Sequence, residues 1–201
     1  MSYHVTEIFC ALQGEGLRAG SRNVFVRFAG CNLTCNEAEH GFDCDTDFAS
    51  KYGVYPSASE LVREIREVWG HSGRGNVILT GGEPGLQVDD GLIATLREND
   101  FYIAIETNGT KVLPIGIDWI TCSPKTAEHT LRVTLVDELK YVRAIRQGIP
   151  KPSLKAKYYY LSPASGAVGP VRENLGWCME LIQKYPKWRL SVQMHKLWGI
   201  R

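Results

Sequence analysis

Short runs of β-branched and aromatic residues alternate with amphipathic segments along this chain, and this alternation constrains its fold more than any other feature. The short runs predict strands at 24–28, 76–80, 102–107, 118–123, 138–142, 157–161 and 189–194. Longer segments with apolar residues at helical spacing predict helices at 57–70, 89–100 and 172–185. Strands that alternate with helices favour a mostly parallel sheet with helices packed on its faces.

The segment 57–70 carries the clearest helix signals. Ser57 and Glu60 fit a capping box at its start, and Gly70 stands where the helix should end. Its apolar residues form one stripe, made of Leu61, Val62, Ile65, Val68 and Trp69. The segment 89–100 repeats the pattern with Leu92, Ile93 and Leu96. Both helices are therefore expected to bury one face.

Chain length limits the architecture. A closed eight-unit α/β barrel usually takes about 250 residues, and this chain has 201. We therefore expect an α/β fold with a partial (β/α) barrel or an open sheet, in a single domain over residues 1–201. In both architectures ligands bind at the carboxyl ends of the strands. The motifs TGGEP (80–84), ETNG (106–109) and SPK (123–125) lie at the ends of predicted strands, which predicts one common site there.

Charge and hydropathy exclude several classes of function. A net charge of +1 gives no reason to expect a nucleic-acid partner or a membrane surface. No apolar run approaches the roughly 20 residues that a membrane-spanning helix needs. The first ten residues lack the basic start and apolar stretch of a signal peptide. We therefore expect a cytoplasmic protein with reduced thiols, whose clustered cysteines serve metal or redox chemistry.

Cys31, Cys35 and Cys44 lie close together in the segment that follows the predicted strand 24–28. Thiolates select zinc, copper(I) or iron–sulfur clusters. From the residues alone, two kinds of metal site are compatible with these cysteines. One is a closed zinc site completed by His40. The other is a [4Fe–4S] cluster on three cysteines, with one iron left to bind the amino and carboxylate groups of S-adenosylmethionine.

Motifs along nearly the whole chain resemble those of one enzyme family. They are EIFCALQGEG (7–16), VFVRFAGCNLTC (24–35), CDTDF (44–48), TGGEP (80–84), AIETNG (104–109), SPK (123–125) and QMHK (193–196). In this order they are similar to those of the 7-carboxy-7-deazaguanine synthases, a family of radical S-adenosylmethionine enzymes. The chain departs from the wider superfamily in the eight residues between Cys35 and Cys44, and from some relatives in YLSP (160–163).

The resemblance implies a partial (β/α) barrel of the radical S-adenosylmethionine type and the activity of a carbon–nitrogen lyase. The implied reaction is the radical-mediated ring contraction of 6-carboxy-5,6,7,8-tetrahydropterin to 7-carboxy-7-deazaguanine, with release of ammonia, in queuosine and deazapurine biosynthesis. The implied cofactors are a [4Fe–4S] cluster, S-adenosylmethionine and Mg²⁺. The implied partners are a pterin substrate, a flavodoxin-like electron donor and a second copy of the chain in a homodimer.

The resemblance also implies roles for individual residues. Those assigned to catalysis are the cluster ligands Cys31, Cys35 and Cys44, and Thr46, whose hydroxyl is a hard ligand suited to Mg²⁺. Those assigned to S-adenosylmethionine are Asp43, Asp45, Gly82, Glu83, Glu106, Ser123, Pro124, Lys125 and Ser162. Those assigned to the substrate are Leu12, Gln13, Gly14, Glu15, Arg27, Thr80, His195 and Arg201. Polar side chains of this group suit a pterin edge, and Arg27 suits a carboxylate.

Several alternatives remain at this stage. Arg27 also fits a salt bridge within the sheet, and Glu106 also fits a pairing with a lysine or arginine. For the whole protein, one alternative is an activase that generates a glycyl radical on a partner enzyme. The other is a non-enzymatic module held together by zinc. Iron and sulfide in anaerobically purified protein would separate an enzyme from such a module.

Overall fold

The computed structural model describes residues 2–44, 46, 53–166 and 169–200. Its strands are β1 (Tyr3–Leu12), β2 (Arg22–Phe28), β3 (Gly53–Tyr55), β4 (Gly75–Gly81), β5 (Phe101–Thr107), β6 (Trp119–Cys122), β7 (Leu135–Arg143), β8 (Lys155–Pro163), β9 (Ser165–Gly166), β10 (Gly169–Pro170) and β11 (Arg189–Leu190). Its helices are α1 (Glu37–His40), α2 (Ala58–Trp69), α3 (Asp90–Glu98), α4 (Arg172–Lys184) and α5 (Met194–Trp198), with 3₁₀ turns η1 (Pro84–Leu86) and η2 (Glu128–Thr130).

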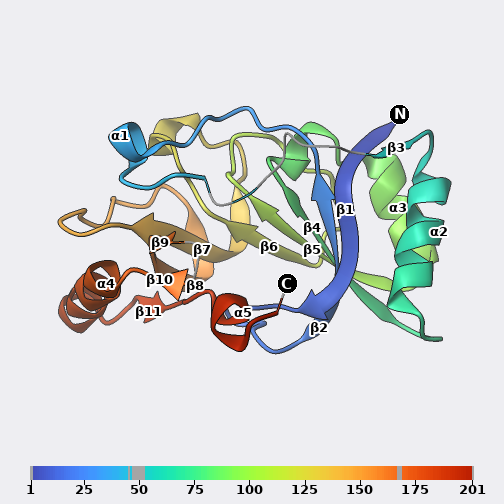
Figure 1. Cartoon of the computed structure of the whole chain (residues 1–201). Helices are drawn as coiled ribbons and strands as arrows, with labels where there is room; N and C mark the ends of the chain where they lie inside the picture. Colours follow the sequence, from blue (N-terminus) through green and yellow to red (C-terminus); the bar gives the residue numbers. More distant parts are fainter. Residues whose placement is uncertain (1, 45, 47–52, 167–168, 201) are drawn as a thin grey trace.

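A mixed sheet organises the fold (Figure 1). Within the described ranges it has nine strands in the order β11-β8-β7-β6-β5-β4-β2-β1-β3. The pairs from β2 to β11 are all parallel, whereas β1 pairs antiparallel with β2 and with β3. The predicted α/β class and mostly parallel sheet are confirmed. The two edge strands of this order are not paired with each other, so the sheet is an open, partial barrel.

Helices α2 and α3 cover one end of the sheet, and α4 lies at the opposite end (Figure 1). The Ser57 hydroxyl accepts the backbone N–H of Glu60, and Gly70 follows the last helical residue, as predicted. The predicted apolar stripe is buried, with Val68 partly so. This stripe packs with the β1, β2, β4 and β5 side chains in one core, and a second core lies between β6–β8 and α4. No helix among the described residues is long and apolar enough to cross a membrane.

One secondary-structure prediction, for the C-terminal segment, is wrong. The strand expected at 189–194 is only two residues long, and residues 194–198 form α5. The backbone N–H of Ser191 still bonds to Leu161, but that of Met194 donates to Gly14 on the loop after β1. Because this contact turns the chain out of the sheet, His195 stands on a short helix and not at a strand end. Strand β1 was not predicted either.

Candidate active site

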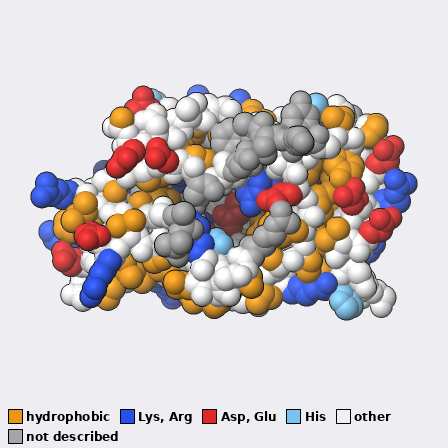
Figure 2. Space-filling model, in the orientation of Figure 1, with side chains coloured by type: hydrophobic (Ala, Val, Ile, Leu, Met, Phe, Trp, Pro, Cys, Tyr) orange, Lys and Arg blue, Asp and Glu red, His pale blue; other side chains and the backbone are white. Residues whose placement is uncertain are grey.

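A cavity of about 340 Å³ opens at the carboxyl ends of the parallel strands. Figure 2 shows the hollow on this face of the molecule, with charged side chains inside it. Most of the predicted site residues line it: Leu12, Gln13, Gly14, Glu15, Arg27, Cys31, Cys35, Asp43, Cys44, Thr46, Thr80, Gly82, Glu106, Ser123, Lys125, Ser162 and His195. Glu83 and Pro124 do not. Asp45 and Arg201 lie outside the described residues.

The GGEP motif joins the end of β4 to the start of the cysteine segment. The backbone N–H of Gly82 donates to Phe28, and that of Glu83 donates to Gly30. A Cβ atom at Gly82 would stand 2.0 Å from the Gly30 carbonyl oxygen and 2.9 Å from Cys31 Cβ. Only glycine permits this approach. The motif therefore brings bare backbone to the cavity wall beside the first cysteine.

Glu83, the acidic residue of the GGEP motif, is held inside the scaffold. Its side chain is fully buried, and its carboxylate accepts the Thr107 hydroxyl at 2.6 Å and the backbone N–H groups of Asn108 at 2.7 Å and Gly85 at 2.8 Å. Burial raises the pKa of Glu83, and these three donors oppose that shift. The carboxylate ties the GGEP loop to the end of β5. The Glu83 side chain therefore has a role inside the scaffold, and its contact with the cofactor stays a prediction.

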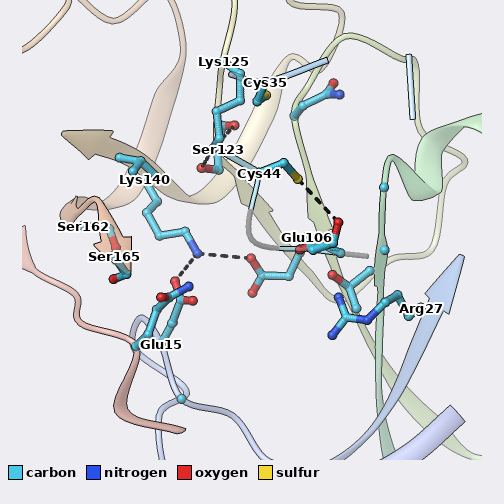
Figure 3. Close-up of a pocket in the computed structure, with 18 of the residues that line it drawn as sticks. Glu15, Arg27, Cys35, Cys44, Glu106, Ser123, Lys125, Lys140, Ser162 and Ser165 are labelled. Atoms are coloured by element: carbon cyan, nitrogen blue, oxygen red, sulfur yellow. Dashed lines mark hydrogen bonds and ion pairs between the residues drawn. The ribbon is translucent and has the colours of Figure 1, made fainter. Parts of the chain in front are cut away.

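The three clustered cysteines all line the cavity, and Figure 3 shows two of them, Cys35 and Cys44. Cys31 Sγ accepts the backbone N–H of Leu33 at 3.4 Å, and the backbone N–H of Cys44 donates to the Cys35 carbonyl oxygen at 3.4 Å. Burial raises the pKa of the Cys31 and Cys35 thiols. Three soft donors beside the bare backbone of Gly82 form a donor set that fits an iron–sulfur cluster.

A closed zinc site fits less well. His40 does not line the cavity, and its Nδ1 atom accepts the backbone N–H of Asn36 at 3.3 Å. Within the part of the chain that the structure describes, no three His, Cys, Asp or Glu side chains are grouped to hold one metal ion. A single zinc ion needs all its sulfur ligands about 2.3 Å from one point. In a cluster, each cysteine binds a different iron, so the thiols stand further apart.

The SPK motif follows β6 and places Ser123 and Lys125 in the same cavity. Lys125 Nζ donates to the Ser123 hydroxyl at 2.5 Å and to its carbonyl oxygen at 3.1 Å. It also lies 5.9 Å from the centroid of the Phe42 ring. Burial lowers the pKa of Lys125 to about 8. The lysine is thus a half-buried cation of the cavity wall.

Comparison with known proteins identifies the family. No protein-family model matches the chain. It is 44% identical to the 7-carboxy-7-deazaguanine synthase of Bradyrhizobium diazoefficiens and 40% identical to that of Bacteroides thetaiotaomicron, over all of both chains in each case. This chain belongs to the 7-carboxy-7-deazaguanine synthase family. The crystal structure of QueE from Escherichia coli superposes with a TM-score of 0.71 at 25% identity, covering 97% of this chain and 95% of that one.

Several of the residues predicted to contact the substrate lie on the loop after β1. Gln13 Nε2 donates to Glu106 Oε1 at 3.1 Å, and the backbone N–H of Glu15 donates to Gln13 Oε1 at 3.2 Å. Lys140 Nζ donates to Glu15 at 2.5 Å and lies 3.4 Å from Glu106 (Figure 3). The expected pairing of Glu106 with a lysine is therefore present. Sequence reasoning did not single out Lys140, although a lysine in a predicted strand was a visible signal.

Arg27 reaches the synthase cavity from β2. Its Nε–H donates to Glu7 Oε1 at 2.6 Å, so the expected salt bridge within the sheet is also present. This bond engages one edge of the guanidinium and orients the group. Beside it, the Phe9 and Phe25 rings stack with centroids 5.3 Å apart and line the cavity. The part of the cavity wall formed by β1 and β2 thus presents the oriented Arg27 guanidinium and an apolar surface made by the two phenylalanine rings.

The C-terminal segment packs against the loop after β1 at the cavity. A Cβ atom at Gly14 would stand 2.3 Å from His195 Nδ1, so the imidazole packs directly on the loop backbone. The backbone N–H of Gly16 donates to the Ser191 hydroxyl at 3.0 Å. His195 therefore enters the site from α5, through contacts between segments almost a chain length apart.

Proposed function

We infer that this protein converts 6-carboxy-5,6,7,8-tetrahydropterin to 7-carboxy-7-deazaguanine with release of ammonia, as a carbon–nitrogen lyase. Identity of 44% over the full length of a synthase supports the reaction. The observation that carries it here is one cavity lined by three thiols, the GGEP backbone and the loop at 12–16. The conversion removes hydrogen from C6 of the pterin, contracts the ring, returns hydrogen and expels ammonia, so the atoms balance.

The family uses a [4Fe–4S] cluster, S-adenosylmethionine and Mg²⁺, and we propose which residues hold them. When bound, the cluster and S-adenosylmethionine would supply the one-electron chemistry needed to remove hydrogen from the pterin. Cys31, Cys35 and Cys44 would hold the cluster. The Thr46 hydroxyl, which lines the cavity, would bind Mg²⁺ together with substrate oxygens and waters.

We propose that S-adenosylmethionine lies along the carboxyl ends of β4, β5, β6 and β8. The Gly82 backbone and the Glu106 carboxylate accept its ammonium group, and Lys125 pairs with its carboxylate. Ser123 and Ser162 bond to its ribose, and Asp43 and Asp45 orient the ligand. Pro124, which is buried, would approach the ligand within the SPK turn.

We propose that the pterin lies between the β1 loop and β2. Arg27 takes the substrate carboxylate with the guanidinium edge that Glu7 does not engage. Gln13, Glu15 and the Gly14 backbone bond to the N–H and carbonyl groups of the pterin edge. Thr80, Leu12 and His195 complete the pocket, together with the terminal carboxylate of Arg201. The Phe9 and Phe25 rings exclude water from the reacting face.

The cysteine assignment has a direct test. Cys31→Ala, Cys35→Ala and Cys44→Ala proteins, purified without oxygen, should each lose the brown absorbance or its reducibility. Cys10→Ala is the matched control, because Cys10 is exposed on β1 and does not line the cavity. A colourless parent protein with a single zinc would refute the function. Full iron content and turnover in one variant would remove that cysteine from the ligand set.

The magnesium assignment is tested separately. Thr46→Ala removes the proposed hydroxyl ligand, so the Mg²⁺ concentration for half-maximal activity should rise at unchanged iron content. A titration that superposes on that of the parent would place the ion elsewhere.

We further propose, from the resemblance, that the chain forms a homodimer and takes its electron from a flavodoxin-like donor. Light scattering on the purified protein tests the first, and turnover with reduced flavodoxin tests the second. All six cysteines are unpaired. Since cluster assembly needs reduced thiols, we propose a cytoplasmic location.

A further inference from the structure

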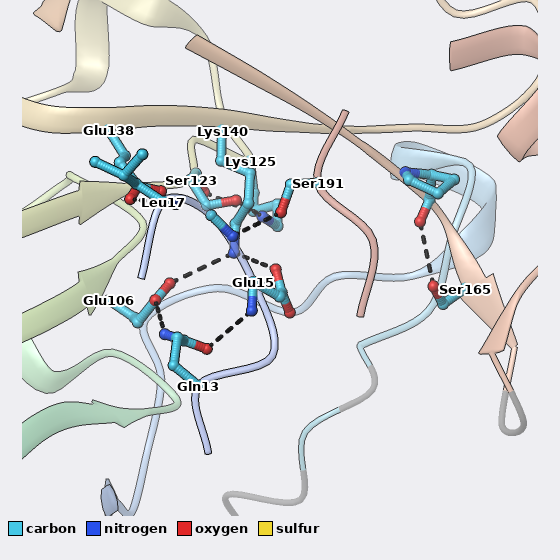
Figure 4. Close-up of polar contacts among 12 residues, drawn as sticks. Gln13, Glu15, Leu17, Glu106, Ser123, Lys125, Glu138, Lys140, Ser165 and Ser191 are labelled. Carbon is cyan, nitrogen blue, oxygen red and sulfur yellow. Dashed lines mark hydrogen bonds and ion pairs between the residues drawn. The ribbon is translucent and has the colours of Figure 1, made fainter. Parts of the chain in front are cut away.

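Lys140 lies on β7 with its side chain between two carboxylates of the cavity wall (Figure 4). The residue is 7% exposed. Its Nζ atom donates to Glu15 Oε2 at 2.5 Å and lies 3.4 Å from Glu106 Oε2. The shorter contact makes Glu15 the principal partner. A buried lysine is costly unless it is paired, so this ion pair defines where the Glu15 side chain lies.

The ion pair is one side of a closed ring of polar contacts. Glu106 Oε1 accepts Gln13 Nε2, and Gln13 Oε1 accepts the backbone N–H of Glu15 (Figure 4). The ring connects the loop after β1 with β5 and β7. Since each member restrains its neighbours, the orientation of Glu15 is fixed from both its backbone and its carboxylate.

A separate contact on β7 anchors the same loop without Lys140. Glu138, two residues earlier on the same face, accepts the backbone N–H of Leu17 at 3.0 Å and Trp119 Nε1 at 3.2 Å. The Ser191 hydroxyl accepts the backbone N–H of Gly16. The loop backbone therefore has its own attachments. Loss of Lys140 would remove the ion pair with the Glu15 carboxylate while the loop stays in place.

The charges around Lys140 favour its pairing. Burial raises the pKa of Glu106, and the Lys140 cation opposes that shift. The other charged groups that act on this cluster are Glu138 from β7, Lys125 from the turn after β6 and Arg18 from the loop after β1. Two carboxylates near each other in a buried wall repel, so one cation between them keeps both available as acceptors.

We propose that Lys140 is a positioning residue for substrate recognition, which holds the Glu15 carboxylate in place to accept the adjacent N–H donors of a flat heterocycle. This rests on the proposed function for the class of substrate and adds the residue that acts through Glu15. Lys140 takes no part in the cysteine site or the GGEP loop, so its effect falls on the substrate and not on the cluster.

The test is a double-mutant cycle between Lys140→Met and Glu15→Gln in anaerobically reconstituted enzyme. Lys140→Met should raise KM for the pterin about tenfold or more, with iron content unchanged. In the Glu15→Gln background the same substitution should change KM less than about threefold, because Lys140 acts through that carboxylate. Lys157→Met, an exposed lysine paired with Asp137 on neighbouring β7, should match the parent.

Two outcomes would overturn the proposal. One is an unchanged KM in Lys140→Met, and the other is an equal rise in KM with and without the Glu15 carboxylate. If Lys140→Met does not fold, Lys140→Arg decides: it should keep KM within about threefold, and a loss as large as that of Glu15→Gln refutes the role. Failure of the proposed function itself would be seen differently, as a parent enzyme that converts no pterin.

Discussion

Glu83→Gln tests whether this buried carboxylate belongs to the scaffold or to the cofactor site. Both of its oxygens accept backbone N–H groups, Oε1 from Gly85 and Oε2 from Asn108, and Oε1 also accepts the Thr107 hydroxyl. A glutamine keeps the shape but has only one acceptor oxygen. Its NH₂ group would face a backbone N–H, so at least one buried donor would lose its partner.

The expected cost follows from these contacts. A buried donor left without a partner costs about 1–3 kcal/mol, and replacement of a charged acceptor by a neutral one weakens the remaining bonds. We expect Glu83→Gln to lower the free energy of unfolding by about 3 kcal/mol, which is large against the 5–15 kcal/mol typical of a domain. Glu98→Gln, at an exposed acid near the end of α3, should change it by less than about 0.5 kcal/mol.

Denaturant unfolding followed by circular dichroism under anaerobic conditions measures this difference, and calorimetric titration measures S-adenosylmethionine affinity. The scaffold role predicts a stability loss with a smaller change in affinity. Parent-like stability with affinity reduced tenfold or more would refute the reasoning, because it would place the carboxylate on the ligand.

Three further predictions concern other parts of the site. Burial raises the pKa of Glu138 to about 7, above its ordinary value. The folded state should therefore lose about 2–3 kcal/mol of stability as the pH rises from about 4.5 to 8. Glu138→Gln should make stability less dependent on pH, and parallel stability–pH curves for the two proteins would contradict the raised pKa. Gly82→Ala should displace the cysteine segment and lower the iron content of the protein. Gly176→Ala, within α4 where a Cβ atom meets no neighbour, is the control and should stabilise the protein by about 0.5–1 kcal/mol. Equal iron content in the two variants would argue against the close approach of Gly82 to Gly30. Arg27→Lys should raise KM for the pterin about tenfold because an ammonium lacks the guanidinium fork, and an unchanged KM would remove Arg27 from the carboxylate site.

Local features of the sequence were sufficient to predict most of the fold. The cap at Ser57, the stop at Gly70 and the stripe through Leu61 and Ile65 act over a few residues, and the structure has α2 where they place it. The mostly parallel sheet was also predicted, because strands alternate with helices along the chain. Polar motifs at the strand ends indicated one site, since parallel strands end at the same edge of a sheet.

The wrong strand prediction and the side-chain partners that were not predicted share one cause. Glu83 lies within a motif that borders the cavity, but the turn after Gly82 directs its carboxylate inward to Thr107. The predicted strand at 189–194 was wrong beyond Leu190, because a contact with Gly14 diverts the chain. In each case the deciding partner lies far away in the sequence.

What the sequence by itself determined is the type and order of the elements and the set of motifs at their ends, because propensity, capping and periodicity depend on near neighbours. The tertiary structure decided which side chains face the cavity and what each one pairs with. Lys140 and Glu15 are 125 positions apart and meet only because β7 and the loop after β1 face the same space. Pairing across such a separation depends on how the strands are ordered in the sheet, and no local pattern contains that information.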